Sequence, residues 1–136
     1  MDRKEIEQLK QKLEQQRYEV LLVLSRLEQE TRSLQADSTQ DSADQCVLTV
    51  SKESMFETSS QRRTQLRLIE AALKRIASSS FGICVGCGDE IQIRRLRAVP
   101  WTQFCLQCQE GIEQEVGARA AAHASLNAVN SWRRTV

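Results

Sequence analysis

The chain has 136 residues, a formal net charge of +1 with its one histidine neutral, and only 4% aromatic residues. So balanced a charge argues against a general nucleic-acid binder, which is usually strongly basic on at least one face. The few aromatic residues exclude a large aromatic-rich core. They suit an elongated helical protein whose small core is stabilised locally by a cross-link such as a bound metal ion. The N-terminus lacks an apolar signal segment, and no apolar run reaches the length of a membrane span. We therefore expect a cytoplasmic protein, whose reduced thiols favour metal ligation over disulfides.

Residues 2–36 carry a heptad pattern that predicts a coiled-coil helix. Apolar residues recur there at alternating spacings of 3 and 4, which places them on one face of a helix. At about 1.5 Å per residue, this helix would be roughly 50 Å long. The residues at its seam positions are Ile6, Leu9, Leu13, Gln16, Val20, Val23, Leu27, Glu30 and Leu34.

A polar segment, residues 35–46, interrupts the pattern with three aspartates and no positive charge. Ser42 followed by Gln45 fits a capping box, which predicts a second helix from about residue 43 to residue 77. Two helices of similar length with a short polar connection favour an antiparallel hairpin, and a parallel dimer of long helices is the alternative. The seam residues of the second helix are Leu48, Met55, Arg62, Leu66, Ile69, Leu73 and Ile76.

Four of the five cysteines form two Cys-x-x-Cys pairs, Cys84/Cys87 and Cys105/Cys108, with seventeen residues between the pairs. This pattern is typical of a tetrahedral four-cysteine zinc site. Because all four thiolates would be ligands, no position is left for a catalytic water, and we expect one structural Zn²⁺. A redox pair would be a single Cys-x-x-Cys in a βαβ setting, which the sequence does not have. An iron–sulfur site is an alternative on ligand type alone.

The chain after the last cysteine is rich in helix formers. We expect a short helix over residues 109–118, interrupted at Gly117. The predicted fold class is therefore all-α, a long antiparallel coiled-coil hairpin followed by a small zinc finger and a C-terminal helix. The predicted segments are the hairpin over residues 1–80 with its tip at about 36–46, the four-cysteine zinc finger over residues 81–110, and the C-terminal helix or tail over residues 111–136.

Asp41 and Asp44 lie at the predicted tip of the hairpin. Helix capping explains them without a function, because unpaired N–H groups and the helix dipole favour aspartate near a helix N-terminus. The alternative is that a rigid arm presents these carboxylates to a cationic or metal-bearing site deep in a partner. Cys46 does not fit the spacing of the zinc ligands. A small residue on the helix is the simpler interpretation of Cys46, and a redox-sensing thiol is the alternative.

The stretch FGICVGCGDEIQIRRLRAVPWTQFCLQCQ resembles the four-cysteine zinc finger of the DksA/TraR family of bacterial transcription regulators. The long hairpin ahead of it extends the resemblance over residues 1 to about 115. Beyond the cysteines and their spacing, the similar residues are Phe81, Gly82, Gly88, Arg94, Arg95, Leu96 and Pro100.

This resemblance implies a coiled coil that enters the secondary channel of RNA polymerase. In the larger family members, an Asp-x-x-Asp-x-Ala motif at the tip lies near the polymerase active site and alters the fate of open promoter complexes. Counting back from Cys84 at the family's separation places the motif at Asp41, Asp44 and Cys46. Both aspartates match, and Cys46 stands where the family has alanine.

Two departures from the larger members bear on function. They have a globular segment before the coiled coil, whereas the heptads here begin at once. Several also bind the alarmone guanosine tetraphosphate together with polymerase, using basic residues at the positions of Leu68, Val99 and Gln109. None of these three carries a positive charge, so we expect the alarmone contacts to be weak or absent.

The sequence thus predicts a zinc-binding, non-enzymatic regulator that binds RNA polymerase and modulates initiation through the tip. We expect a monomer without sequence-specific DNA binding or membrane attachment. One alternative is a non-catalytic adaptor whose arm pairs with another coiled coil. Another is a direct DNA-binding zinc protein, which the near-neutral charge disfavours.

Overall fold

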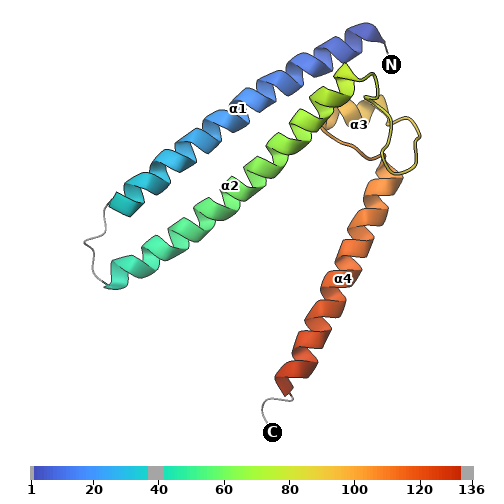
Figure 1. Ribbon diagram of the computed structural model, residues 1–136. Coiled ribbons are helices and arrows are strands. Elements are labelled where there is room, and N and C mark those ends of the chain that lie inside the picture. The colour runs from blue at the N-terminus through green and yellow to red at the C-terminus, as the bar shows by residue number, and fades with distance from the viewer. Residues whose placement is uncertain (1, 37–41, 133–136) are drawn as a thin grey trace. The chain divides into compact units, whose positions relative to one another are not determined.

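The computed structural model describes residues 2–36 and 42–132, and the side chains of residues 2–36 and 46–120. Two long helices, α1 (Arg3–Ala36) and α2 (Ser42–Ala77), lie side by side and antiparallel (Figure 1). A short helix α3 (Ile93–Ala98) and a long helix α4 (Leu106–Trp132) follow. No described residue belongs to a strand, apart from an isolated bridge between Ile83 and Glu90. The predicted all-α fold with its helical hairpin is confirmed.

The chain divides into two compact units. The first, which we call the hairpin unit, comprises Met1–Phe81 and Ile93–Thr102. The second, the finger unit, comprises Gly82–Gln92 and Gln103–Val136. Within the described ranges, no helix is both long enough and apolar enough to span a bilayer.

The C-terminus of α2 is closed by main-chain hydrogen bonds. The Ser80 N–H donates to the Arg75 carbonyl at 2.9 Å, and the Ser79 N–H donates to the Ile76 carbonyl at 3.2 Å. This is the bonding pattern of a Schellman motif, which requires a left-handed residue just past the helix end. Ser79 takes that conformation with φ 58°. The predicted end of the second helix at residue 77 is confirmed.

The core of the hairpin lies toward the N-terminal end of α1 and the C-terminal end of α2. Its buried side chains are Leu9, Leu13, Val20 and Leu24 from α1, with Ile69 and Ala72 from α2. Val23, a predicted seam residue, is half-buried, and Leu24 takes the buried place. Leu13 and Leu24 are eleven residues apart, and an eleven-residue spacing corresponds to about 3.67 residues per turn rather than the 3.5 of a strict heptad. The buried stripe of α1 therefore drifts off the heptad register.

The distal half of the hairpin is less well packed. The predicted seam residues Leu27, Leu34, Leu48 and Met55 are only half-buried, and Glu30 and Arg62 are exposed. Charged side chains at two seam positions cannot be buried without paired partners, so this part of the seam stays open to solvent.

Helix α4 runs without interruption through Gly111 and Gly117. The predicted break at Gly117 is wrong. A glycine in a helix interior costs only about 1 kcal/mol relative to alanine, and the alanine-rich sequence that follows favours the helix. A Cβ added at either glycine would meet nothing within 4 Å, so neither is required by close packing within the described residues.

Candidate metal centre

The first cysteine pair lies on a tight turn of the finger unit. The Ile91 N–H donates to the Gly82 carbonyl at 2.7 Å, and the Cys84 N–H donates to the Asp89 carbonyl at 2.8 Å. These bonds pair the two sides of the turn around Cys84 and Cys87. Gly88 has φ +79°, the left-handed region that glycine enters without steric cost. The glycine directly after the second cysteine thus allows the chain to reverse.

The second pair, Cys105 and Cys108, lies at the start of α4. The Gln109 N–H donates to the Cys105 carbonyl at 3.0 Å, which begins the helical ladder. The Val85 N–H donates to the Gln103 carbonyl at 2.9 Å, and this bond holds the first turn beside the segment that leads into α4.

These two segments bring four sulfurs together. The Sγ atoms of Cys84, Cys87, Cys105 and Cys108 all lie within 4.8 Å of one another. A tetrahedral zinc ion with Zn–S bonds of about 2.3 Å requires S···S separations of about 3.8 Å. The Sγ atoms of Cys87 and Cys105 are 3.7 Å apart, which fits that tetrahedron. The donor set and its spacing therefore suit one Zn²⁺.

The thiols have unlike proton affinities. The N–H of Cys105 donates to the Cys84 sulfur at 3.2 Å and lowers the pKa of Cys84 to about 6. The N–H of Asp89 acts in the same sense on Cys87, but hydrogen bonds with neighbouring thiols, Cys84 first, and burial raise the pKa of Cys87 to about 12. A hydrogen bond with Cys105 likewise raises the pKa of Cys108. Four thiolates so close need a cation, so metal binding displaces protons and weakens as pH falls.

Gly86, in the first turn, packs closely on Cys108 of the second pair. A Cβ at this position would lie 3.0 Å from the Cys108 Sγ and 3.4 Å from the Cys108 Cβ. The Cys108 sulfur cannot shift to make room without leaving its place among the other three. The closeness of Gly86 to Cys108 is a site feature that sequence reasoning missed.

We expect Gly86→Ala to weaken zinc binding by about 5- to 150-fold, since overpacking typically costs about 1–3 kcal/mol and each 1.4 kcal/mol is tenfold in affinity. Competition with a chromogenic chelator measures the affinity. Gly111→Ala is the matched control, because its Cβ would meet nothing within 4 Å. Equal zinc affinity in the two variants would contradict the assigned contact.

Of the other predicted site residues, the structure describes the side chain of Cys46 alone. Cys46 is an exposed residue of α2 and does not belong to the four-sulfur group. Asp41 lies outside the described residues. Asp44 belongs to α2, but its side chain is outside the described set. The role of the tip therefore stays a prediction.

Comparison with known proteins places this geometry in context. Residues 79–114 match the family described as "Prokaryotic dksA/traR C4-type zinc finger". The match covers the four clustered cysteines and their turns. Together with the sulfur geometry, it identifies the cluster as a structural zinc site that takes one metal ion.

Similarity extends beyond the finger. An uncharacterized protein of Aquifex aeolicus (strain VF5) is 34% identical over 119 residues, covering 86% of this chain and 82% of that protein. The RNA polymerase-binding transcription factor DksA of Haemophilus influenzae is 43% identical over 49 residues, covering 36% of this chain. That alignment spans about a third (34%) of the Haemophilus protein. The structure of transcription factor DksA2 from Pseudomonas aeruginosa superposes with a TM-score of 0.74 at 25% identity, covering 85% of this chain and 88% of DksA2.

Proposed function

This chain belongs to the DksA/TraR family of zinc-finger transcription regulators, and on that premise we propose that it binds RNA polymerase and modulates initiation with its hairpin inserted into the secondary channel. The zinc finger orients the base of the arm, the packed half of the seam stiffens it, and the acidic tip is the effector. Asp41 and Asp44 act there as carboxylates, with Cys46 next to them. The protein acts by binding and not by catalysis.

One observation carries the proposal more than any other. The likeness to DksA2 covers 85% of this chain, so it includes a long helical hairpin as well as the finger. Helix α1 has 34 residues and is therefore about 50 Å long, which suits an arm that reaches into a deep channel. The net charge of +1 supports a protein partner over direct DNA binding, which would depend steeply on salt.

The double variant Asp41→Ala/Asp44→Ala tests the role of the tip. We expect it to bind purified core polymerase within about threefold of the parent affinity, because the finger and most of the arm are unchanged and about 0.6 kcal/mol is threefold. Its effect on open-complex lifetime in a transcription assay should be lost, since the proposed effector carboxylates are gone.

Glu7→Ala/Glu14→Ala is the matched control, because it removes the same charge from exposed positions of α1. It should keep both polymerase binding and the effect on open complexes. A parent protein that does not bind polymerase would refute the proposed partner. An Asp41→Ala/Asp44→Ala variant with full effect would refute the role of the tip alone.

We further propose that the polymerase effect does not depend on the alarmone contacts of larger relatives. Leu68 and Val99 are half-buried apolar residues, and the Gln109 side chain donates to Glu113 at 2.8 Å. None of them offers a cation to a phosphate. Guanosine tetraphosphate added to the transcription assay should change the size of the effect by less than about twofold, because a single lost phosphate contact to a cation is already worth about 1.5–3 kcal/mol. A larger response would contradict this part of the proposal.

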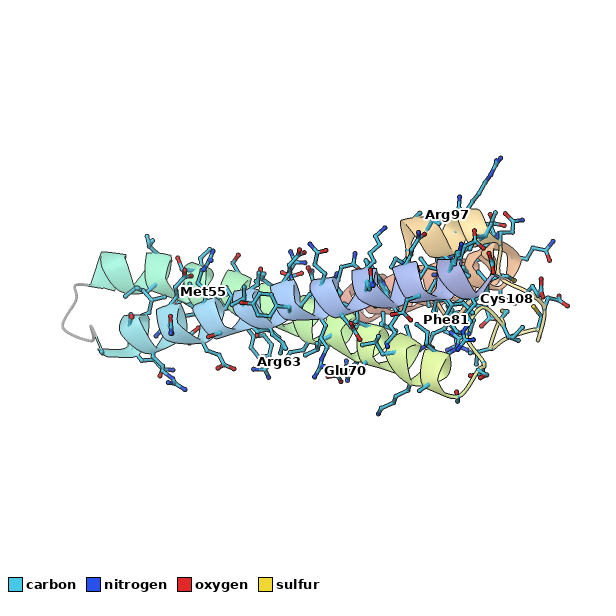
Figure 2. The ribbon with its side chains drawn as sticks, turned by 90° about the horizontal axis from the view of Figure 1, so that it is seen from above. Met55, Arg63, Glu70, Phe81, Arg97 and Cys108 are labelled. Carbon is cyan, nitrogen blue, oxygen red and sulfur yellow. The ribbon has the colours of Figure 1, made fainter. Side chains whose placement is uncertain are left out.

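A second candidate function rests on the open distal seam. A groove of roughly 590 Å³ lies there, with Leu27, Met55 and the 78% exposed Phe56 among its lining residues. Figure 2 shows Met55 and Arg63 in this part of the hairpin. The lining carries both signs of charge, for example Glu53 and Arg63, so a second copy related by two-fold symmetry could pair with it. The protein would then be a coiled-coil adaptor. A dimer mass in light scattering, without polymerase binding, would favour this function over the first.

A further inference from the structure

The segment Ile93–Thr102, which contains α3, lies between the two zinc-ligand pairs in the sequence but folds with the hairpin unit. Its two ends lead directly into the finger unit, at residues 88–92 on one side and 103–104 on the other. The part of the chain that the metal must close into a loop is therefore mostly held by the helices of the arm. Contacts with α1 and α2 hold the segment Ile93–Thr102 in this position.

Polar contacts from both long helices hold the segment. The Lys12 ammonium donates to the Arg97 carbonyl at 2.7 Å, and the Arg97 guanidinium forms an ion pair with the Glu5 carboxylate. That hydrogen bond from Arg97 lowers the pKa of Glu5. The Arg75 guanidinium of α2 donates to the Thr102 carbonyl at 3.3 Å. Figure 2 shows Arg97 on α3 beside the N-terminal end of α1.

Apolar burial adds to these contacts. Leu96 of α3 is 1% exposed, and Pro100 is among the fully buried side chains. Thr102 is also buried, at 7% exposed, so three residues of this ten-residue segment are withdrawn from water. The segment is therefore docked by packing as well as by hydrogen bonds.

We infer that the segment Ile93–Thr102 is a mechanical link that couples zinc occupancy to the base of the arm. With the segment docked, zinc binding must order only the five residues 88–92 and the two residues 103–104, instead of all seventeen between the cysteine pairs. Loop-closure entropy grows as (3/2) ln n, so this shortening strengthens zinc binding about fourfold. Coupling is reciprocal, so zinc holds the segment on α1 and α2 by the same factor.

The double variant Glu5→Gln/Lys12→Met tests the link with changes in α1, which belongs to the hairpin unit. It removes both side-chain contacts that α1 makes with Arg97 and leaves the net charge unchanged. We expect zinc affinity to fall about fourfold in chelator competition. Leu96→Ala, which removes the buried side chain of α3, should lower zinc affinity at least as much.

The matched control is Glu28→Gln/Arg17→Met, which likewise replaces one glutamate by glutamine and one basic residue by methionine. It does so in two ion pairs between α1 and α2, Glu28–Arg63 and Arg17–Glu70. Its zinc affinity should equal that of the parent. Unchanged affinity in both Glu5→Gln/Lys12→Met and Leu96→Ala would overturn the link. An equal loss in the control would also overturn it, since general destabilisation of the hairpin would then explain the effect.

Hydrogen exchange of the parent protein supplies the reciprocal measurement. Removing zinc with a chelator should speed amide exchange about fourfold in the first three turns of α1, because local opening there becomes easier when α3 undocks. The Glu5→Gln/Lys12→Met variant should show little further change on zinc removal. Exchange in α1 of the parent that is independent of zinc would refute the coupling.

Discussion

Cys84→Ser is expected to abolish stable zinc binding and to unfold the finger turn. Cys84 is 2% exposed, and its sulfur accepts a hydrogen bond from the Cys105 N–H. The same sulfur is therefore a zinc ligand and the acceptor of a hydrogen bond that joins the two cysteine pairs. Structural zinc contributes about 10–16 kcal/mol in small zinc-finger peptides at pH 7, which far exceeds what a turn of this size can replace by packing. Loss of one of four thiolates also leaves three crowded sulfurs without charge compensation.

Metal analysis after dialysis against a mild chelator measures the result. The parent should retain one zinc per chain, and Cys84→Ser should retain close to none. Cys46→Ser is the matched control, because this fifth cysteine is exposed and lies outside the four-sulfur cluster. A Cys84→Ser protein that keeps a full equivalent of zinc would show that the four-sulfur site is not the metal site.

Leu13→Ala is expected to destabilise the hairpin by about 2–5 kcal/mol, the usual cost of truncating a fully buried leucine. Leu13 is 0% exposed, and only a few side chains of the hairpin share that degree of burial. Since small domains are stable by only about 5–15 kcal/mol, this single change removes a large part of the free energy of unfolding. The distal half of the seam cannot compensate for this loss, because its apolar side chains are only half-buried.

Urea denaturation followed by far-ultraviolet circular dichroism measures this change in zinc-loaded protein. Leu21→Ala makes the same substitution on the same helix at a side chain that is 42% exposed, and it should cost less than about 1 kcal/mol. Equal midpoints for Leu13→Ala and Leu21→Ala would mean that the hairpin does not depend on the buried seam.

Much of the fold follows from local sequence patterns, namely apolar periodicity, helix-capping residues and cysteine spacing. The apolar stripe and the absence of glycine and proline before Phe81 predict two long helices, and α1 and α2 have nearly the predicted bounds. Helix α2 begins at Ser42, within one residue of the predicted start. The two Cys-x-x-Cys pairs likewise predict their metal, because zinc ligation depends on residue type and spacing.

Local patterns mislead where two weak tendencies compete. Gly117 is a helix breaker by propensity, and its cost of about 1 kcal/mol is offset by the helix formers around it. Val23 fits the heptad better than Leu24, but a helix near 3.6 residues per turn drifts away from a seven-residue repeat. Leu24 is buried in consequence.

For the four-cysteine site, the sequence alone predicted the ligands and favoured zinc, since four thiolates at this spacing admit a closed tetrahedral site. Only the tertiary structure decided what surrounds them. It brings Gly86 against Cys108, and it pairs Arg97 with Glu5, 92 residues apart in the sequence. Such contacts depend on how helices and turns pack against one another in three dimensions. Local propensity and residue spacing do not determine that packing. The grouping of α3 with the arm, and its proposed link to the zinc, therefore became visible only in three dimensions.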